Sequence, residues 1–473
     1  MFFRRFYDEG LAQASYLIGC DRSGEAVVVD ANRDIAQYLS AAAAERLRIT
    51  KVAETHIHAD FVSGSRELAK RTGATLLLSA EGGRDWQYAF ATSDHATLLH
   101  DGDVFHADRV RFDVVHTPGH TPEHLAFLVT DLAASDRPVG LLSGDCVFVG
   151  DVGRPDLLER AAKIVGTMED SARALFASLK RLRELPDFVQ LWPGHGAGSA
   201  CGKSLGALPQ STIGYERIAN WGFAVTDEDA FVREVLAGQP EPPAYFAEMK
   251  RINREGPPFL AEWPQPERLE GHRLDAALSE RAVIVDLRSA DSFADGHAPG
   301  TLNIPLSKSF TTWAGTLLPY GRDLYLIAAT QSEAARAAGE MAKIGLDRVA
   351  GWFGAEALAE WSSGGGSVEQ VTQASASGIA ARVTNGEVTV VDVRSAAEWA
   401  HGHLPGALHI PLGVLSERVA TIPRRKPVIV QCQGGARSAM AASVLQRHGV
   451  PDVINLRGGY DEWRREALPI VHD

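Results

Sequence analysis

Short apolar runs separated by amphipathic stretches organise the first half of the chain. Strands are predicted where such runs occur, at 26–30, 49–53, 74–79, 111–115, 125–129, 139–142 and 188–192. Residues 35–47 have the spacing of a helix, as does an apolar stripe formed by Ala172, Leu175, Phe176, Leu179 and Leu182. We interpret this stripe as a core face. Strands mixed with helices in this order favour two packed sheets with helices outside them.

The second half of the chain repeats itself. Proline-rich stretches at 238–243 and 256–266 mark a boundary before the repeat begins. Residues 282–290 then match 388–396, and residues 296–306 match 402–412, with three consecutive glycines between the copies. Each copy reads strand, helix, strand, which favours a parallel sheet with helices on both faces. We therefore predict three domains, at 1–250, 267–365 and 374–473.

Composition excludes several classes of partner. The net charge of −13 argues against a nucleic-acid partner and offers no basic arm to anionic lipid. No apolar run approaches the roughly 20 residues that span a bilayer, and residues 1–6 are too soon polar for a signal peptide. The four cysteines are widely scattered, which is not a disulfide framework. We therefore expect a reducing compartment, the cytoplasm.

Histidines and carboxylates follow the predicted strands. The stretch His-x-His-x-Asp comes directly after the strand at 49–53, and three shorter motifs of the same kind follow later in the chain. The residues concerned are His56, His58, Asp60, His120, Asp145 and His195. Imidazole suits zinc, copper, iron and nickel, and a neighbouring carboxylate favours a harder divalent ion. The sequence therefore predicts a metal site at the ends of these strands.

The second copy of the repeat carries a cysteine at the end of a predicted strand. Cys432 follows the apolar run 428–431, and the loop Gln433, Gly434, Gly435 and Ala436 leads into a helix that begins near Arg437. Backbone N–H groups of such a loop form an anion site, which would lower the pKa of the cysteine and stabilise its anion. Aligning the copies puts Ala328 at the position of Cys432 and Glu333 at that of Arg437. We therefore expect the first copy to be inactive.

These motifs carry a resemblance to known families. In their order, the metal motifs resemble those of the metallo-β-lactamase fold, and residues 143–156 resemble the persulfide dioxygenases, relatives of glyoxalase II that hold one iron ion. The Asp-x-Arg and Gly-His-x-Pro-Gly phrases of both copies resemble the rhodanese domain. The whole order is similar to the CstB-type persulfide dioxygenase–sulfurtransferase fusion proteins. It implies an αββα metallo-β-lactamase-fold domain, then two α/β rhodanese-like domains with parallel sheets, the second active.

The resemblance also implies a ligand set. Dinuclear members of the fold have a histidine after the aspartate of the first motif, and Phe61 stands there in this chain. One Fe(II) per chain is therefore expected, held by His56, His120 and Asp145. Two imidazoles and one carboxylate with open positions form the facial triad of non-haem iron oxygenases. The remaining residues of the motifs, His58, Asp60 and His195, are expected beside the ligands, orienting them or holding water.

Two further residues are candidates for substrate binding. The resemblance implies that Arg154 contacts the carboxylate of a thiol carrier, since a guanidinium grips carboxylates with two parallel hydrogen bonds. A salt bridge with Asp156 is an equally good interpretation of that arginine. Cys201 lies on a loop of small residues six positions after His195. It would line the cavity and accept sulfur, or it is simply buried, as free cysteines commonly are.

The implied function combines two reactions. A persulfide dioxygenase would oxidise a low-molecular-weight persulfide, of glutathione or coenzyme A type, with O2 to sulfite and thiol. The rhodanese site at Cys432 and Arg437 would convert sulfite and a second persulfide to thiosulfate, which would detoxify sulfide. Relatives of this kind assemble as dimers or tetramers, so a homo-oligomer is expected. Three alternatives stay open: a zinc-dependent thioester hydrolase of glyoxalase II type, a reverse flow of sulfur from thiosulfate, and a non-enzymatic sulfur carrier.

Overall fold

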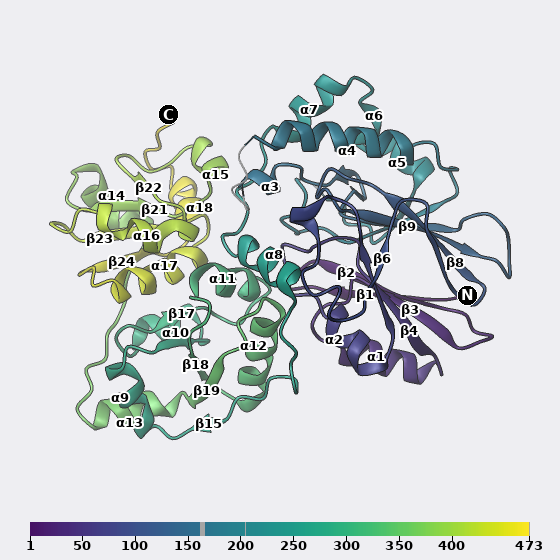
Figure 1. The fold of residues 1–473 in the computed structure, drawn as a ribbon. Coiled ribbons are helices and arrows are strands. Elements are labelled where there is room, and N and C mark those ends of the chain that lie inside the picture. The colour runs from purple at the N-terminus through teal and green to yellow at the C-terminus, as the bar shows by residue number, and fades with distance from the viewer. Residues whose placement is uncertain (161–165, 204, 473) are drawn as a thin grey trace. The chain divides into compact units, whose positions relative to one another are not determined.

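The computed structural model describes residues 1–160, 166–203 and 205–472. The chain divides into two compact units (Figure 1). One comprises Met1–Trp263 together with Ala342–Gly345, and the other comprises Pro264–Met341 and Leu346–Asp473.

Two six-stranded sheets form the N-terminal unit. The first runs in the order β1 (Phe2–Asp8), β2 (Gln13–Gly19), β3 (Glu25–Val29), β4 (Arg48–Ala53), β5 (Thr75–Ser79), β6 (Thr97–Leu99). The second runs in the order β14 (Ser211–Thr212), β13 (Gln190–Pro193), β10 (Gly140–Gly144), β9 (Leu125–Asp131), β8 (Val110–His116), β7 (Val104–Ala107). One buried cluster joins the sheets, with Tyr16 and Val29 from the first and Phe112, Phe127 and Trp192 from the second. The sheets therefore pack face to face.

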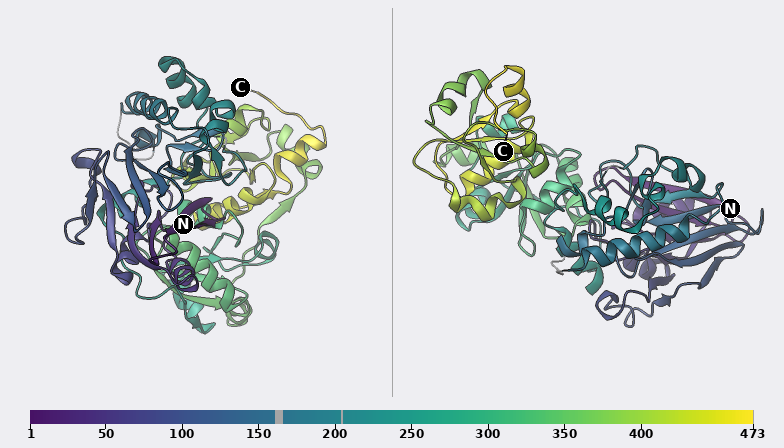
Figure 2. Two further views of the ribbon diagram at one scale, coloured as in Figure 1. Left: turned by 90° about the vertical axis from the view of Figure 1, so that its right-hand side faces the viewer. Right: turned by 90° about the horizontal axis from the view of Figure 1, so that it is seen from above.

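Helices cover the outer faces of both sheets (Figures 1 and 2). On the first sheet, Tyr38 of α1 (Ala36–Ala44) and Leu68 of α2 (Ser65–Thr72) share a core with the strands. On the second, Leu175 of α4 (Met168–Leu182) and Phe231 of α7 (Glu228–Leu236) do the same. Shorter elements complete the unit: η1 (Arg84–Trp86), the pair β11 (Val147–Phe148) and β12 (Asp151–Val152), α3 (Leu157–Arg160), α5 (Ile213–Ala219), α6 (Trp221–Ala224) and α8 (Phe246–Glu255). The expected αββα fold is confirmed.

The first two strands lie outside the sequence prediction. β1 and β2 form an antiparallel pair at the edge of the first sheet, with Phe2 opposite Gly19 and Asp8 opposite Gln13. β1 contains Arg4 and Arg5 and is only partly buried, so it shows no apolar run. β2 is fully buried yet contains Gln13 and Ser15. Edge position and buried polar residues therefore hid both strands from the hydrophobic pattern.

The C-terminal unit contains two five-stranded sheets with the same parallel topology. The first is ordered β15 (Arg268–Leu269), β19 (Val349–Gly354), β18 (Leu324–Ala328), β16 (Val283–Asp286), β17 (Leu302–Asn303). The second is ordered β20 (Thr372–Ala374), β24 (Val453–Leu456), β23 (Val428–Gln431), β21 (Thr389–Asp392), β22 (Leu408–His409). The interior strands β16 and β23 are buried throughout, as in parallel sheets covered on both faces. The internal repeat is therefore a repeat of the fold.

Helices surround each of these sheets. The first copy has α9 (His272–Ser279), α10 (Ala290–Asp295), α11 (Phe310–Leu317), α12 (Gln331–Lys343) and α13 (Glu356–Ser363). The second has α14 (Ala376–Thr384), α15 (Ala396–Ala400), η2 (Leu412–Val414), α16 (Leu415–Arg418), η3 (Val419–Thr421), α17 (Ala436–Arg447) and α18 (Gly459–Arg465). The copies touch through α17, where the Ser443 hydroxyl accepts the N–H of Asn303 at 3.0 Å. The first copy thus supports the helix that follows Cys432.

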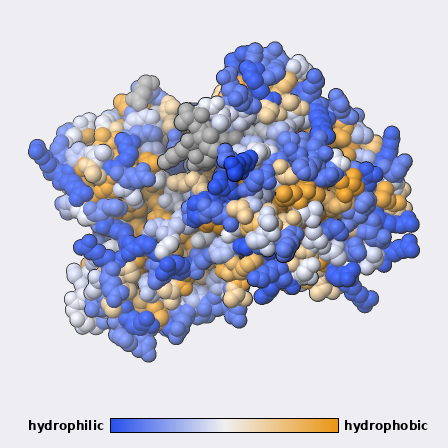
Figure 3. All heavy atoms as spheres, in the orientation of Figure 1, coloured by the Kyte–Doolittle hydropathy of each residue, from blue (hydrophilic) through white to orange (hydrophobic). Residues whose placement is uncertain are grey.

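Within the described ranges, every helix is too short or too polar to cross a membrane. Hydrophilic residues cover much of the face drawn in Figure 3, and apolar residues are scattered between them.

Candidate metal centre and cysteine loop

Three of the motifs meet at the carboxyl ends of strands. His56 follows β4, His120 follows β8 and Asp145 follows β10, and their ligand atoms all lie within 4.8 Å of one another. The Asp145 Oδ2 atom lies 3.9 Å from Nε2 of His56 and 3.5 Å from Nε2 of His120. All three side chains are buried. The strand ends therefore hold two imidazoles and one carboxylate in one place.

The chemistry of these three side chains fits a divalent cation. Nε2 of His56 and both carboxylate oxygens of Asp145 are buried without a hydrogen-bond partner. An unpaired buried polar group costs roughly 1–3 kcal/mol, and an ion at this point would satisfy all three atoms. Burial lowers the pKa of His56 well below its usual value and that of His120 to about 3, so both imidazoles are neutral and able to ligate. Burial raises the pKa of Asp145 to about 6, and a cation would favour its ionised form.

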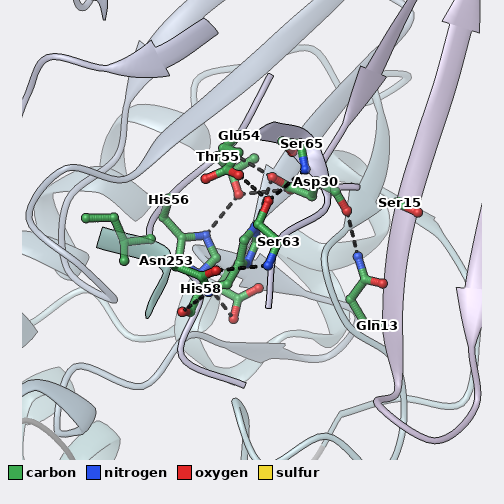
Figure 4. Close-up of polar contacts among 12 residues, drawn as sticks. Gln13, Ser15, Asp30, Glu54, Thr55, His56, His58, Ser63, Ser65 and Asn253 are labelled. Carbon is green, nitrogen blue, oxygen red and sulfur yellow. Dashed lines mark hydrogen bonds and ion pairs between the residues drawn. The ribbon is translucent and has the colours of Figure 1, made fainter. Parts of the chain in front are cut away.

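A hydrogen-bond chain orients His56 (Figure 4). Nδ1 of His56 lies 2.9 Å from Oγ1 of Thr55. The Thr55 hydroxyl donates to Asp30 at 2.9 Å, and the same carboxylate accepts the backbone N–H of Thr55 at 2.7 Å. Because its own proton is engaged with Asp30, the Thr55 oxygen accepts the Nδ1 proton of His56. The lone pair of Nε2 is therefore left for a metal ion, as in many metal sites.

His58 faces the same carboxylate rather than the cluster. Its Nε2 lies 3.2 Å from Oδ1 of Asp30, and its ring is 4.4 Å from the ring of Phe61. Burial by itself would lower the pKa of His58, but the charge of Asp30 raises it to about 9. A protonated imidazole has no lone pair to offer a cation. His58 therefore stands beside the three-residue cluster and braces Asp30.

A second cluster adjoins the first. Nε2 of His195 lies 3.3 Å from Asp60 and 3.5 Å from Asp145, while its Nδ1 is 3.0 Å from the carbonyl of Ala12. The Cys201 sulfur lies within 4.8 Å of ligand atoms of Asp60 and His195. Both oxygens of Asp60 are buried without a hydrogen-bond partner. Burial raises the pKa of Cys201 well above its usual value, so the thiol is protonated. Asp60 and His195 thus border the expected ligands, and Cys201 lines the same interior.

His124 supports the backbone of the candidate ligand Asp145, and the sequence analysis did not single it out. Its Nε2 accepts the backbone N–H of Asp145 at 3.0 Å, and its Nδ1 lies 2.8 Å from the hydroxyl of Thr117. Burial lowers the pKa of His124 well below its usual value, which keeps Nε2 free to accept. Gly144 has φ +49°, and a Cβ there would lie 2.6 Å from this Nε2. The spacing of four residues between His120 and His124 was the available signal.

Arg154 is fully buried and bonded to the protein. Its Nε and Nη2 donate to Asp156 at 3.0 and 2.7 Å, and the guanidinium also donates to the carbonyls of Ala200 and Pro240. This arrangement is the salt bridge that the sequence offered as one alternative. The substrate-binding role of Arg154 stays a prediction.

The cysteine loop places backbone N–H groups at a sulfur atom. Cys432 follows β23 directly, is 1% exposed, and its Sγ accepts the N–H of Gly435 at 3.1 Å. Gly435 has φ +100°, a left-handed conformation that a side chain would strain, and α17 begins at the next residue. The sulfur also lies 3.5 Å from the hydroxyl of Ser438. The loop therefore solvates a sulfur anion with backbone and helix N-terminus.

Arg437 is held by a carboxylate that the sequence analysis did not single out. Its guanidinium donates to both oxygens of Glu398, at 2.7 and 2.6 Å. Glu398 also completes a capping box with Ser395 at the start of α15. Partial burial by itself would raise the pKa of Glu398, but the hydrogen bond from Arg437 lowers it to about 2. The pair therefore stays charged at neutral pH, and Ser395-x-x-Glu398 was its signal in the sequence.

Replacing Glu398 by glutamine should slow the sulfur transfer that the rhodanese resemblance implies at Cys432. The amide removes the charge that fixes Arg437, and we expect kcat of the Cys432 reaction to fall about tenfold, since small misplacements of positioned groups are costly. The measurement is the rate of thiosulfate formation from sulfite and a persulfide. Glu417→Gln on α16, an exposed position, is the control. An unchanged kcat would show that the ion pair only holds α15 against α17 and has no part in catalysis.

The first copy lacks both parts of this site. Asp286 pairs with Ile327 as Asp392 pairs with Gln431, so Ala328 occupies the position of Cys432. The N–H of Ala329 donates to Glu333 at 3.0 Å, so the copy's own carboxylate fills the loop. In residues 328–333, all of which the structure describes, no cysteine is present and one backbone N–H is already bound to Glu333.

Comparisons with known proteins agree with this organisation. The metallo-beta-lactamase superfamily model matches residues 8–195, and the rhodanese-like domain model matches residues 271–353 and 375–466. A crystal structure of a metallo-beta-lactamase from Staphylococcus aureus subsp. aureus COL is 40% identical, with a TM-score of 0.67, over 75% of this chain and 99% of that chain.

Two curated proteins each match part of the chain. A sulfurtransferase of Allochromatium vinosum is 42% identical over 18% of this chain and 79% of that protein. A hydroxyacylglutathione hydrolase of Prochlorococcus marinus is 28% identical over 37% of this chain and 62% of that protein, which is less than two thirds of its length. The chain therefore belongs to the metallo-β-lactamase superfamily, and it carries two rhodanese-like domains after that fold.

Proposed function

We propose that the chain joins an Fe(II)-dependent persulfide dioxygenase to a sulfurtransferase, as in the fusion proteins that it resembles. The first reaction is R–S–SH + O2 + H2O → R–SH + SO3²⁻ + 2 H⁺. The second is SO3²⁻ + R–S–SH → S2O3²⁻ + R–SH. The observation that carries the proposal is the buried His56–His120–Asp145 cluster in one chain with the Cys432 loop.

The residues of the metal centre favour one ion per chain. His56, His120 and Asp145 would hold it, and Phe61 supplies no donor where dinuclear relatives have a histidine. Iron bound there would supply one-electron chemistry. The persulfide needs it because its electrons are all paired, whereas O2 has two unpaired electrons. Thr55 and Asp30 hold the proton of His56 away from the site, and His124 holds the backbone of Asp145. Burial of the whole cluster excludes bulk water.

Sulfur transfer at Cys432 needs two substitutions at sulfur. The Cys432 thiolate attacks the outer sulfur of a persulfide, an S–S bond forms, and R–S⁻ leaves. Sulfite then attacks the outer sulfur of the Cys432 persulfide. The bond between the two sulfur atoms of this persulfide breaks, which releases thiosulfate and restores the Cys432 thiolate. The N–H of Gly435 and the start of α17 stabilise the sulfur anion at each stage.

Joining both sites in one chain consumes sulfite where it is made. The cell would use the pair to clear sulfide-derived persulfides of glutathione or coenzyme A type. We propose that the protein carries out both reactions in the cytoplasm and that it assembles as a homo-oligomer.

A zinc-dependent thioester hydrolase is the second candidate. The Asp60–His195–Cys201 cluster beside the first one offers donors for another ion, and a hydroxyacylglutathione hydrolase is among the similar proteins. A dinuclear zinc site would generate hydroxide for hydrolysis and would need no oxygen.

Loading the protein with either metal separates the two candidates. Iron-loaded and zinc-loaded protein would each receive glutathione persulfide with O2 and, separately, a glutathione thioester. The dioxygenase proposal expects O2 uptake and sulfite with iron, and no thioester hydrolysis with zinc. Thioester hydrolysis by the zinc form, with no O2 uptake by the iron form, would replace it with the hydrolase.

A further inference from the structure

Asn253 lies on α8, outside the residues 8–195 that the superfamily model matches. Its side chain is only 1% exposed. A buried amide is costly unless it is hydrogen-bonded, so its partners indicate what the residue does.

The side chain of Asn253 is hydrogen-bonded to the 58–63 loop, which begins within the first metal motif (Figure 4). Its Nδ2 donates to the carbonyls of His58 at 2.8 Å and Phe61 at 2.7 Å. Its Oδ1 accepts the N–H of Ser63 at 2.9 Å. One side chain therefore satisfies two carbonyl groups and one N–H group of the loop backbone, which elsewhere would be hydrogen-bonded to a neighbouring strand.

The bonds flank Asp60, whose own side chain has no such support. Both oxygens of Asp60 are buried without a hydrogen-bond partner, and Oδ2 lies 3.3 Å from Nε2 of His195. Apart from this contact with His195, the position of the carboxylate is set by the loop backbone. The same holds for Phe61, whose carbonyl is one of the two acceptors and whose ring packs on His58.

The helix is a firm support for this contact. Phe246 and Met249 of α8 are buried, and the carbonyl of Arg254 accepts the N–H of Ala89 at 2.8 Å. Asn253 thus fixes the 58–63 loop relative to the packed helix α8.

We propose that Asn253 is a positioning residue of the metal centre. It holds the 58–63 loop so that Asp60 and Phe61 border the His56–His120–Asp145 cluster, and it thereby fixes the surroundings of the ion. This inference rests on the proposed metal centre. It does not depend on which reaction the centre performs.

Cobalt(II) binding to the full-length, metal-free protein tests the proposal. In Asn253→Asp, a carboxylate oxygen would face two carbonyls in place of the amide N–H groups. We expect Co(II) affinity to fall about 10–100-fold, the range known for residues that support metal ligands, and the d–d absorption bands to shift. Arg251→Ala, which removes only exposed ion pairs on the same helix, should leave both unchanged.

Each outcome decides the question. Co(II) affinity within twofold of the parent and unshifted bands, even with a lower Tm, would reduce Asn253 to a stability residue. An equal loss in Arg251→Ala would assign the effect to the helix as a whole. If Asn253→Asp does not fold, Asn253→Ser is judged by the same two readouts. Cobalt binding is measured without any enzymatic reaction. A negative result for Asn253 would therefore leave the dioxygenase proposal untouched, and loss of the dioxygenase proposal would leave the cobalt result valid.

Discussion

Asp145→Ala should lose its iron and all persulfide-dependent O2 uptake. The carboxylate is the only anionic member of the His56–His120–Asp145 cluster, and its Oδ2 lies within 3.9 Å of both imidazole nitrogens. Residues that merely support ligands cost about 10–100-fold in metal affinity when replaced, so loss of a ligand should exceed roughly 100-fold. The measurements are iron content after desalting and O2 consumption with glutathione persulfide.

An exposed aspartate provides the control for this variant. Asp136→Ala, in the loop between β9 and β10, should keep both iron and activity. Sulfur transfer at Cys432 should survive in either protein. Iron retained by Asp145→Ala together with normal O2 uptake would refute the ligand assignment.

Cys432→Ser should separate the two reactions. A serine hydroxyl cannot carry sulfane sulfur, so the second reaction stops while the metal centre is untouched. We expect O2 uptake at the parental rate, sulfite accumulating at about one per O2, and thiosulfate falling to background. Product analysis of the reaction with persulfide and O2 measures all three.

A second cysteine variant shows whether the effect is specific. Cys20→Ser changes a buried thiol whose Sγ lies 3.3 Å from Asp108, and it should leave the ratio of sulfite to thiosulfate unchanged. Thiosulfate formed at the normal rate by Cys432→Ser would contradict the division of labour between the sites.

The hydrophobic pattern predicted most of the architecture because it is strongest where a strand is buried on both faces. The runs at 26–30 and 139–142 became β3 and β10, which are almost wholly buried. The internal match of the two copies predicted their shared topology. β1 and β2 were missed because one is a partly buried edge strand and the other buries polar residues.

Motif order also predicted that His56, His120 and Asp145 would come together, because each follows the end of a strand and the two sheets pack face to face. It could not supply their supports. His124, Glu398 and Asn253 act through hydrogen bonds or ion pairs that include partners 21, 39 and 195 positions away, respectively. Local spacing could mark His124 and Glu398 as candidates, but which distant residues they contact depends on packing between elements, and for Asn253 the sequence carried no such mark.

Metal content measured together with O2 consumption tests the central claim most directly. Purified protein would be assayed for iron and zinc per chain, and for O2 uptake with glutathione persulfide and coenzyme A persulfide. The account predicts one iron per chain and stoichiometric O2 uptake with at least one of these substrates. Two metal ions per chain, or a single zinc with no response to O2, would contradict it.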